Sequence, residues 1–336
     1  MQFFQPTLHP PAENVSFEGQ TAIITGANTG IGLETARQLL QRRAAAVILA
    51  VRTVQKGEAA KATLLADPTI RALHPHPSIT TMQLDMADYA SVTSFAAAFQ
   101  AAHPRLDLLI LNAGVGPVVF ARSASGHERA VQVNYLSNAA LLFALLPLLH
   151  ATAQTTGAAS RVTWVGSRAH RSALPSLIGK APLDDEDVFA YLDDERRYSG
   201  FARYPDSKLL GVMFLDELAQ RVGVAEGRVV VNMCCPGMVF TGIADVLPWY
   251  VRVPLKAVKM VRARTAEQGA WVSVNAAAGV GAESHGVFLL DMERAEKCDF
   301  LKTENGKKTQ KVVWEQTMVE VSKYVDVPQW AGRPGK

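Results

Sequence analysis

Apolar residues along this chain follow two kinds of pattern. Short runs without alternation are typical of strands covered on both faces. Longer stretches repeat apolar residues every three or four positions, as helices do. This alternation predicts an α/β fold with one doubly wound parallel sheet of about seven strands and flanking helices. The expected strands are 21–25, 47–51, 78–84, 106–111, 161–165, 229–233 and 286–290, and the expected helices are 54–65, 89–102, 127–150, 206–222 and 265–278, with another from Gly32 onward.

Several segments depart from this alternation. The expected organisation is an N-terminal lead (1–19), one α/β domain (20–291) and a C-terminal extension (292–336). Within the domain, 168–203 is a long polar insertion, and 240–261 is apolar and aromatic where a loop is due. In the extension the apolar spacing predicts a final amphipathic helix that packs on the core. It rests on Val313, Trp314, Thr317, Met318, Val321 and Val325.

Composition and charge exclude several classes of protein. Of the 336 residues, 49% are hydrophobic and 19% charged, which is enough apolar material for a large core. The net charge is +3 and basic residues are scattered, so no nucleic-acid partner is expected. Cys234, Cys235 and Cys298 have neither metal-ligand nor disulfide spacing, and we expect no metal. The acidic clusters at 184–187 and 193–195 are interpreted as solvated or helix-start charges.

No transmembrane segment or secretory signal is expected. The longest apolar run, 139–149, is broken by Pro147 and is too short to span a bilayer. Residues 1–17 lack a basic start followed by an apolar core. These patterns predict a soluble, cytoplasmic protein.

A glycine-rich turn follows the first expected strand. Residues 25–32 read Thr-Gly-Ala-Asn-Thr-Gly-Ile-Gly, and a helical apolar spacing begins at the last glycine. A strand, a glycine turn and a helix aim free N–H groups and the positive helix end at a phosphate. The turn therefore predicts a site for a nucleotide pyrophosphate, and the alternative is a turn that serves packing alone.

Tyr204 and Lys208 form a second chemical pattern. If a helix begins near here, two residues four positions apart present their side chains on one face. A neighbouring ammonium favours a phenolate, so we expect the pKa of Tyr204 to fall from about 10 toward neutrality. That spacing alone is weak evidence, and the glycine turn at an earlier position strengthens it.

With these two patterns, the chain resembles the short-chain dehydrogenase/reductase family from about residue 17 to 290. It is most similar to the retinol-dehydrogenase-like branch and its fungal members. The resemblance is carried by 25–36, Arg52 with 56–58, 84–88, 112–114, Tyr204 with Lys208, and 314–317 in the tail. It implies a single-domain Rossmann fold and an oxidoreductase. Relatives pair through the helices near Asn134 and Tyr204, so a homodimer is one expectation.

The resemblance implies four catalytic residues. Tyr204 is the general acid and base, and Lys208 binds the nicotinamide ribose and tunes the tyrosine. Ser167 holds the substrate oxygen, and Asn134 kinks its helix and supports a proton relay. The alternatives are that Asn134 is a plain polar helix residue and Ser167 a plain strand-end hydroxyl.

The resemblance also implies the cofactor site. The glycines form the pyrophosphate turn, Asp85 and Met86 meet adenine, and 112–114 line the cleft, although Asn112 could instead only pin neighbouring strands. Val239 and Thr241 hold the carboxamide and phosphates. The expected cofactor-binding residues are Gly26, Asn28, Thr29, Gly30, Ile31, Gly32, Arg52, Asp85, Met86, Asn112, Ala113, Gly114, Tyr204, Lys208, Pro236, Gly237, Val239 and Thr241.

Arg52 indicates the cofactor. It directly follows the second expected strand, and the next acidic residue is Glu58. A carboxylate there would hold the ribose hydroxyls of NAD, whereas a guanidinium matches the 2′-phosphate of NADP(H). The alternative is a surface arginine at a strand end.

The loops after strands five and six indicate the substrate. The interval from Ser167 to Tyr204 is long for the family and predicts a lid or another substrate-facing element. The 240–261 segment predicts a bulky hydrophobic substrate, unless it packs on the core, on a partner or against a membrane. Its expected contacts are Phe240, Leu247, Trp249 and Tyr250.

The function expected from these features is NADP(H)-dependent carbonyl reduction or secondary-alcohol oxidation, in fungal secondary metabolism. One alternative on the same scaffold is an epimerase, dehydratase or cyclase. Another alternative is a sensor that binds NADP(H) without turnover.

Overall fold

One eight-stranded sheet organises the chain. The computed structural model describes residues 5–116, 119–172, 176–180, 187–222, 229–240 and 262–332. The strand order is β3-β2-β1-β4-β5-β6-β7-β8. The first seven strands pair in parallel, as the sequence predicted, and β8 adds a short antiparallel edge after the point where strands were expected to end. The strands are β1 (Thr21–Thr25), β2 (Ala46–Val51), β3 (Ser78–Gln83), β4 (Leu108–Leu111), β5 (Ser160–Val165), β6 (Val229–Cys235), β7 (Phe288–Leu290) and β8 (Glu293–Arg294).

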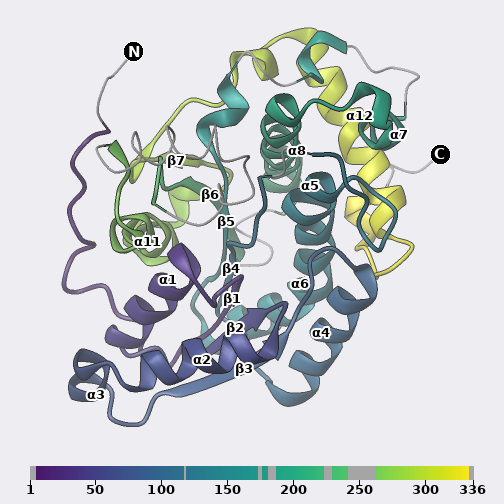
Figure 1. Cartoon of the computed structure of the whole chain (residues 1–336). Coiled ribbons are helices and arrows are strands. Elements are labelled where there is room, and N and C mark those ends of the chain that lie inside the picture. Colours follow the sequence, from purple (N-terminus) through teal and green to yellow (C-terminus); the bar gives the residue numbers. More distant parts are fainter. Residues whose placement is uncertain are drawn as a thin grey trace.

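Helices cover both faces of the sheet (Figure 1). One face carries α1 (Gly30–Gln41), α2 (Val54–Leu65) and α11 (Ala266–Val274). The other carries α4 (Tyr89–Ala102), α6 (Ser137–Thr156) and α8 (Gly200–Arg221), with α12 (Glu304–Val321) packed outside α8. The central strands β1, β4 and β6 are buried throughout, which explains their unbroken apolar runs, whereas the edge strands β3 and β8 are partly exposed. The remaining described helices are α3 (Pro68–Leu73), α5 (Arg129–Val131) and α7 (Val188–Asp193), with π-helical turns at Gln132–Leu136 and Asn275–Gly279.

The helix around Pro147 corrects one expectation. Pro147 lies inside α6, which continues to Thr156, so the proline does not interrupt the apolar run. Within the described residues, the stretch Arg129–Thr156 is long and apolar enough to cross a membrane, and 72% of its apolar window is buried in the fold. Its burial between the sheet, α4 and α8 accounts for this composition, as in a core helix of a globular protein.

The C-terminal extension completes the core. As predicted, it contains an amphipathic helix, α12, and Val325 lies just beyond its end. Trp314 packs on Phe143 and Phe214 of the two central helices. The hydroxyl groups of Tyr135 and Thr317 are 2.6 Å apart and buried. The face of α8 that the sheet does not cover is therefore covered by the chain's own tail.

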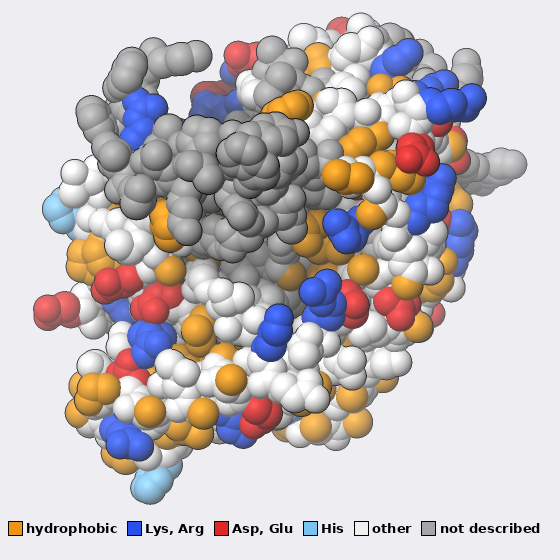
Figure 2. Space-filling model, in the orientation of Figure 1, with side chains coloured by type: hydrophobic (Ala, Val, Ile, Leu, Met, Phe, Trp, Pro, Cys, Tyr) orange, Lys and Arg blue, Asp and Glu red, His pale blue; other side chains and the backbone are white. Residues whose placement is uncertain are grey.

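The surface and the cysteines carry little further chemistry. The three cysteines are buried and free, as small core residues would be. Among the described residues, no group of three or more His, Cys, Asp or Glu side chains is placed to hold a metal ion. On the face shown in Figure 2, basic side chains are interspersed with acidic and hydrophobic ones.

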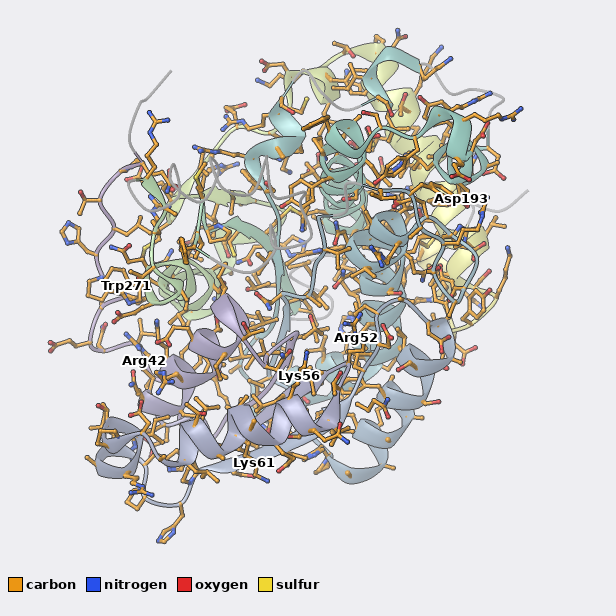
Figure 3. All side chains as sticks on the ribbon, in the orientation of Figure 1. Arg42, Arg52, Lys56, Lys61, Asp193 and Trp271 are labelled. Carbon is orange, nitrogen blue, oxygen red and sulfur yellow. The ribbon has the colours of Figure 1, made fainter. Side chains whose placement is uncertain are left out.

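His127 joins the insertion to the extension. Its Nδ1 lies 2.8 Å from Asp193 at the end of α7, and its Nε2 lies 3.0 Å from Glu320 on α12. Figure 3 places Asp193 beside α7 and α12. Asp193 was expected to be a solvated or helix-start charge, and it is instead paired because the tertiary fold brings this histidine to it. Asp187 and Asp194 cap short helices, as that interpretation proposed.

The His127 cluster makes stability depend on pH. Burial lowers the pKa of His127, but hydrogen bonds to Asp193 and Glu320 outweigh it and raise the pKa from 6.5 to about 9. Because the pKa of His127 is higher in the folded protein than in the unfolded chain, the charged histidine stabilises the fold fully at pH values below 6.5. This contribution is lost as the pH rises through about 9. We expect the free energy of unfolding to fall by about 1–2 kcal/mol between those values, measured by urea denaturation. His127→Gln should remove this dependence of the free energy of unfolding on pH, whereas His76→Gln, a control at an exposed histidine, should keep it. An unchanged dependence in His127→Gln would contradict the assignment.

Candidate active site

The predicted site residues gather at the carboxyl edge of the sheet, where the strand order reverses between β1 and β4. Thr25 ends β1, and its Oγ1 accepts hydrogen bonds from the backbone N–H groups of Asn112 and Ala113 at 3.0 and 2.9 Å. The Asn112 amide returns a hydrogen bond of 2.8 Å to the Thr25 carbonyl. Asn112 therefore pins neighbouring strands, as the alternative reading held, and direct cofactor contact stays a prediction. Ligands of open α/β sheets bind at such a switch point.

The glycine turn is shaped to admit a phosphate. Gly26 and Gly30 have φ angles of +68° and +58°, which side-chain-bearing residues rarely adopt. A Cβ on Gly32 would lie 2.5 Å from the Asn112 amide nitrogen and 2.6 Å from the Gly26 carbonyl oxygen. Within the described chain, Thr29 at the start of α1 makes no side-chain cap to the helix N–H groups. The turn thus presents free donors beside a helix N-terminus and fits a nucleotide pyrophosphate.

Asn134 lies in a π-helical turn between α5 and α6. Its Oδ1 accepts from Val115 N–H at 2.7 Å, and its Nδ2 donates to the Val115 carbonyl at 2.9 Å and to Ser207 Oγ at 3.0 Å. These bonds join the loop after β4 to α8, which also carries Tyr204 and Lys208 and is called the catalytic helix below. They also use both amide hydrogens, so the side chain itself has none left for a proton relay.

Ser167, Tyr204 and Lys208 meet beside this turn. The helix that carries Tyr204 begins at Gly200, earlier than expected, so Tyr204 and Lys208 lie within it and share a face. Tyr204 and Ser167 are joined by a side-chain hydrogen bond. The ammonium of Lys208 lies 5.7 Å from the centre of the Tyr204 ring and donates to the Val165 carbonyl at 3.0 Å. A Cβ on Gly114 would approach Asn134 Oδ1 to 3.2 Å and lie 3.7 Å from that ammonium, so the loop after β4 passes close to both residues.

Burial, rather than the ammonium, dominates the tyrosine's ionisation. It raises the pKa of Tyr204 above 10, and the Ser167 hydrogen bond only partly opposes this. The expected lowering is therefore wrong for the protein alone, because the Lys208 ammonium is directed at the Val165 carbonyl. Burial also lowers the pKa of Lys208, to about 8. Tyr204 is thus neutral near pH 7 and can donate a proton.

The loop after β6 is held by the N-terminal lead. Gln5 accepts a 2.6 Å hydrogen bond from Met238 N–H and donates to the Met238 carbonyl at 2.9 Å. Gly237 has a φ of +77°, and Val239 packs close to Ile31 across Gly269. Pro236 is buried, and its carbonyl accepts from Arg264 at 3.0 Å.

Only part of the expected substrate and nicotinamide contacts can be located. Phe240 follows this loop and is 46% exposed. Thr241, Leu247, Trp249 and Tyr250 lie outside the described residues.

The residues expected at the adenine end of the cofactor differ in exposure. Arg52 is exposed just before α2, and Figure 3 labels it with Lys56 at that helix. Asp85 accepts from Ala87 N–H at 2.9 Å and shapes its own turn. Met86 is only 5% exposed and its side chain packs in the core, so an adenine contact there would use its main chain.

Three residues of the site were missed from the sequence. Gln5 and Arg264 brace the loop after β6, and Arg203 is buried beside Tyr204. Gln5 and Arg264 act through the tertiary fold and leave no local signal. Arg203 did leave one, because a cation directly before Tyr204 and three residues before Asp206 lies on the same helix as both.

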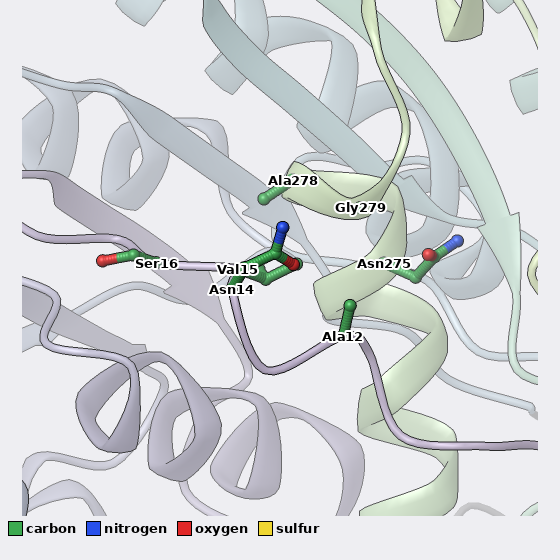
Figure 4. A pocket seen from close by; sticks show the side chains of 7 residues that line it. All are labelled: Ala12, Asn14, Val15, Ser16, Asn275, Ala278 and Gly279. Carbon is green, nitrogen blue, oxygen red and sulfur yellow. The ribbon is translucent and has the colours of Figure 1, made fainter.

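A separate cavity lies at the opposite edge of the sheet. It measures about 360 Å³ and is formed by the N-terminal lead and the end of α11 (Figure 4). None of the predicted site residues lines it. Since α11 runs back toward the amino ends of the strands, this cavity is away from the switch point where ligands of such sheets bind.

Comparison with known proteins yields one family. The short chain dehydrogenase family matches residues 20–177. The chain is 46% identical to the short chain dehydrogenase yanD of Aspergillus niger and 45% identical to macD of Penicillium terrestre, each over 98% of both chains. A crystal structure of an uncharacterized protein from Mycobacterium paratuberculosis superposes with a TM-score of 0.66 at 26% identity, covering 96% of this chain and 100% of that one. These similarities confirm the family and its fungal relatives.

Proposed function

This chain belongs to the short-chain dehydrogenase family of oxidoreductases, and we propose that it is an NADP(H)-dependent enzyme that interconverts a ketone and a secondary alcohol. The observation that carries the proposal is the meeting of Ser167, Tyr204 and Lys208 beside a glycine turn shaped for a pyrophosphate. The bound dinucleotide would supply or accept the hydride. The protein's residues would hold the substrate oxygen and move the proton.

The proposed mechanism follows from donor placement. Ser167 and Tyr204 direct their hydroxyls at one carbonyl oxygen, where negative charge develops during reduction. Because burial keeps Tyr204 protonated, it donates its proton to that oxygen as the carbon is reduced. Lys208 stabilises the phenolate that results. Since the Asn134 amide is fully engaged, a water relay to Lys208 would use backbone groups of the π-helical turn.

The two alternative functions differ from the proposed one in their cofactor turnover and in their need for Tyr204. An epimerase, dehydratase or cyclase on this scaffold would show turnover without net change in the cofactor. A non-catalytic sensor would bind NADP(H) with no need for a buried Tyr204 hydrogen-bonded to Ser167. Following the absorbance of reduced nicotinamide with a panel of ketones and alcohols separates the three.

Tyr204→Phe tests the mechanism. The substitution removes the proton donor and keeps the ring, so we expect kcat to fall by about 100-fold or more while the dissociation constant for NADPH changes little. Tyr324→Phe, a substitution at an exposed tyrosine, should leave both unchanged. Near wild-type turnover in Tyr204→Phe would exclude the proposed mechanism.

The preference for NADP(H) rests on Arg52. It is exposed at the end of β2, where the adenosine ribose lies in open sheets of this topology. Hydrogen bonds to charged groups contribute about 1.5–3 kcal/mol, which is enough for a clear preference between cofactors.

Arg52→Asp should reduce or abolish this preference. We expect the KM for NADPH to rise about tenfold or more, because a carboxylate repels the 2′-phosphate, with a smaller change for NADH. Arg71→Asp, an exposed charge reversal on α3, serves as the control. If wild type uses both cofactors equally, the assignment of Arg52 fails.

We propose a bulky, mostly apolar substrate that enters between the 168–203 insertion and the loop after β6. Both segments follow the carboxyl ends of strands, and Phe240 is a large apolar side chain left exposed there. The similar proteins yanD and macD are short chain dehydrogenases of fungi, and the role in fungal secondary metabolism stays a prediction. The homodimer and the cytoplasmic location stay predictions.

Phe240→Ala tests the substrate class. Burying a phenylalanine side chain against a ligand contributes about 1.5–3 kcal/mol, so the KM for a bulky apolar ketone should rise about tenfold. The KM for a small polar carbonyl should change little, and Val319→Ala on the exposed face of α12 provides the control. Equal effects on large and small substrates would refute the hydrophobic site.

A further inference from the structure

Arg203 is a buried cation directly before the catalytic tyrosine. Its side chain is 1% exposed, and a buried guanidinium is costly unless it is paired. Its Nε lies 3.8 Å from Glu128 Oε2, and its Nη1 lies 3.7 Å from Asp206 Oδ2. Among the described residues, none accepts a hydrogen bond from its nitrogens. Charge attraction to two carboxylates, and the Tyr198 ring 5.5 Å away, therefore hold it in place.

Glu128 connects Arg203 to the element that carries Asn134. The carboxylate caps α5 by accepting from Ala130 and Val131 N–H at 3.0 and 3.1 Å, and it is fully buried. The short helix α5 leads directly into the π-helical turn. The position of Glu128 therefore sets the start of the turn that holds Asn134.

Asp206 connects Arg203 to the segment that follows Ser167. Its Oδ2 accepts from Ser176 Oγ at 2.7 Å, and its Oδ1 accepts from Leu177 N–H at 3.2 Å. Leu177 is fully buried in the core. Asp206 thereby fastens the insertion to the catalytic helix.

The turn that contains Tyr204 has little support of its own. Ser199 before α8 makes no side-chain cap within the described residues. Pro205 has no N–H, so the Phe201 carbonyl lacks its normal partner within the helix. The backbone bond from Arg203 N–H to the Ser199 carbonyl remains, at 2.8 Å, and the contacts of the Arg203 side chain add to it where the bond at Pro205 is missing.

We propose that Arg203 is a positioning residue that joins, through Glu128 and Asp206, the turn that holds Asn134, the insertion at Ser176 and Leu177, and the helix that carries Tyr204. This inference rests on the proposed function, since it concerns the same catalytic groups. The guanidinium pairs with Glu128 and Asp206 and would act on Tyr204 through the helix turn that both Arg203 and Tyr204 share. A catalytic group misplaced by about 1 Å can cost about 100-fold in rate.

Arg203→Met and Arg203→Lys test the proposal in the full-length protein. In Arg203→Met we expect kcat to fall about tenfold or more, with the KM and the NADPH dissociation constant within about twofold of wild type. Arg203→Lys keeps a cation and should recover part of kcat. Arg196→Met removes an exposed arginine that pairs with Asp194 in the same insertion, and should behave as wild type.

A charge-neutral variant separates positioning from folding. Arg203→Met alone leaves two buried carboxylates without a cation, which destabilises the fold. Adding Glu128→Gln and Asp206→Asn removes that repulsion, so Tm should recover while kcat stays low. If kcat recovers together with Tm, or if Arg203→Met retains wild-type kcat, the positioning role is excluded.

Hydrogen exchange supplies a readout that needs no turnover. Arg203→Met should speed amide exchange about tenfold in 199–208, because this segment would open more often on its own. Exchange in the sheet strands should stay unchanged. If wild type reduces no carbonyl but this local change appears, the proposed function fails and the positioning role stands. If wild type is active and exchange in 199–208 is unaltered, the positioning role fails and the function stands.

Discussion

The hydrogen bonds between Thr25 and Asn112 are the constraint on which the site depends. They hold the loops after β1 and β4 together where the strand order reverses. There is no space for a Cβ between Gly32 and the Asn112 amide, so a glycine at this position lets the turn lie close to this pair. The loop after β4 then reaches Asn134 through Val115, and Asn134 reaches the catalytic helix through Ser207. A small number of buried polar bonds thus relates the cofactor turn to the catalytic tyrosine.

The electrostatics of the site come mainly from desolvation. Burial raises the pKa of Tyr204 and lowers that of Lys208, so it favours the neutral form of each group. A neutral phenol is the right form for donating a proton, and a lysine with a pKa of about 8 is still mostly charged at neutral pH. In the proposed mechanism, reduction uses the protonated form of Tyr204 that burial favours, and oxidation would use its phenolate.

The two segments outside the regular alternation are fastened by charge. His127 joins α7 to α12 through Asp193 and Glu320, and Asp206 joins Ser176 and Leu177 to α8. The described parts of the insertion are therefore attached to the core through Ser176, Leu177 and Asp193. The lid or substrate-facing element that the length of the insertion predicts stays a prediction.

The sequence by itself determined the local elements and the chemistry they can carry. Helices 54–65 and 89–102 were predicted to their ends, because apolar spacing is a local signal. The glycine turn and the spacing of Tyr204 and Lys208 were also readable, since both are set by residues close together in the chain. The family they indicated is confirmed by relatives over nearly the whole length.

Only the tertiary structure decided what surrounds those residues. Pro147 was expected to break the apolar run 139–149, which instead belongs to one long buried helix. Lys208 was expected to acidify a tyrosine that burial makes less acidic. Gln5, 232 positions before Gly237, braces the loop after β6, and Arg203 lies between carboxylates from two different elements. Burial and long-range pairing depend on which distant segments meet, and no spacing within a single element encodes that.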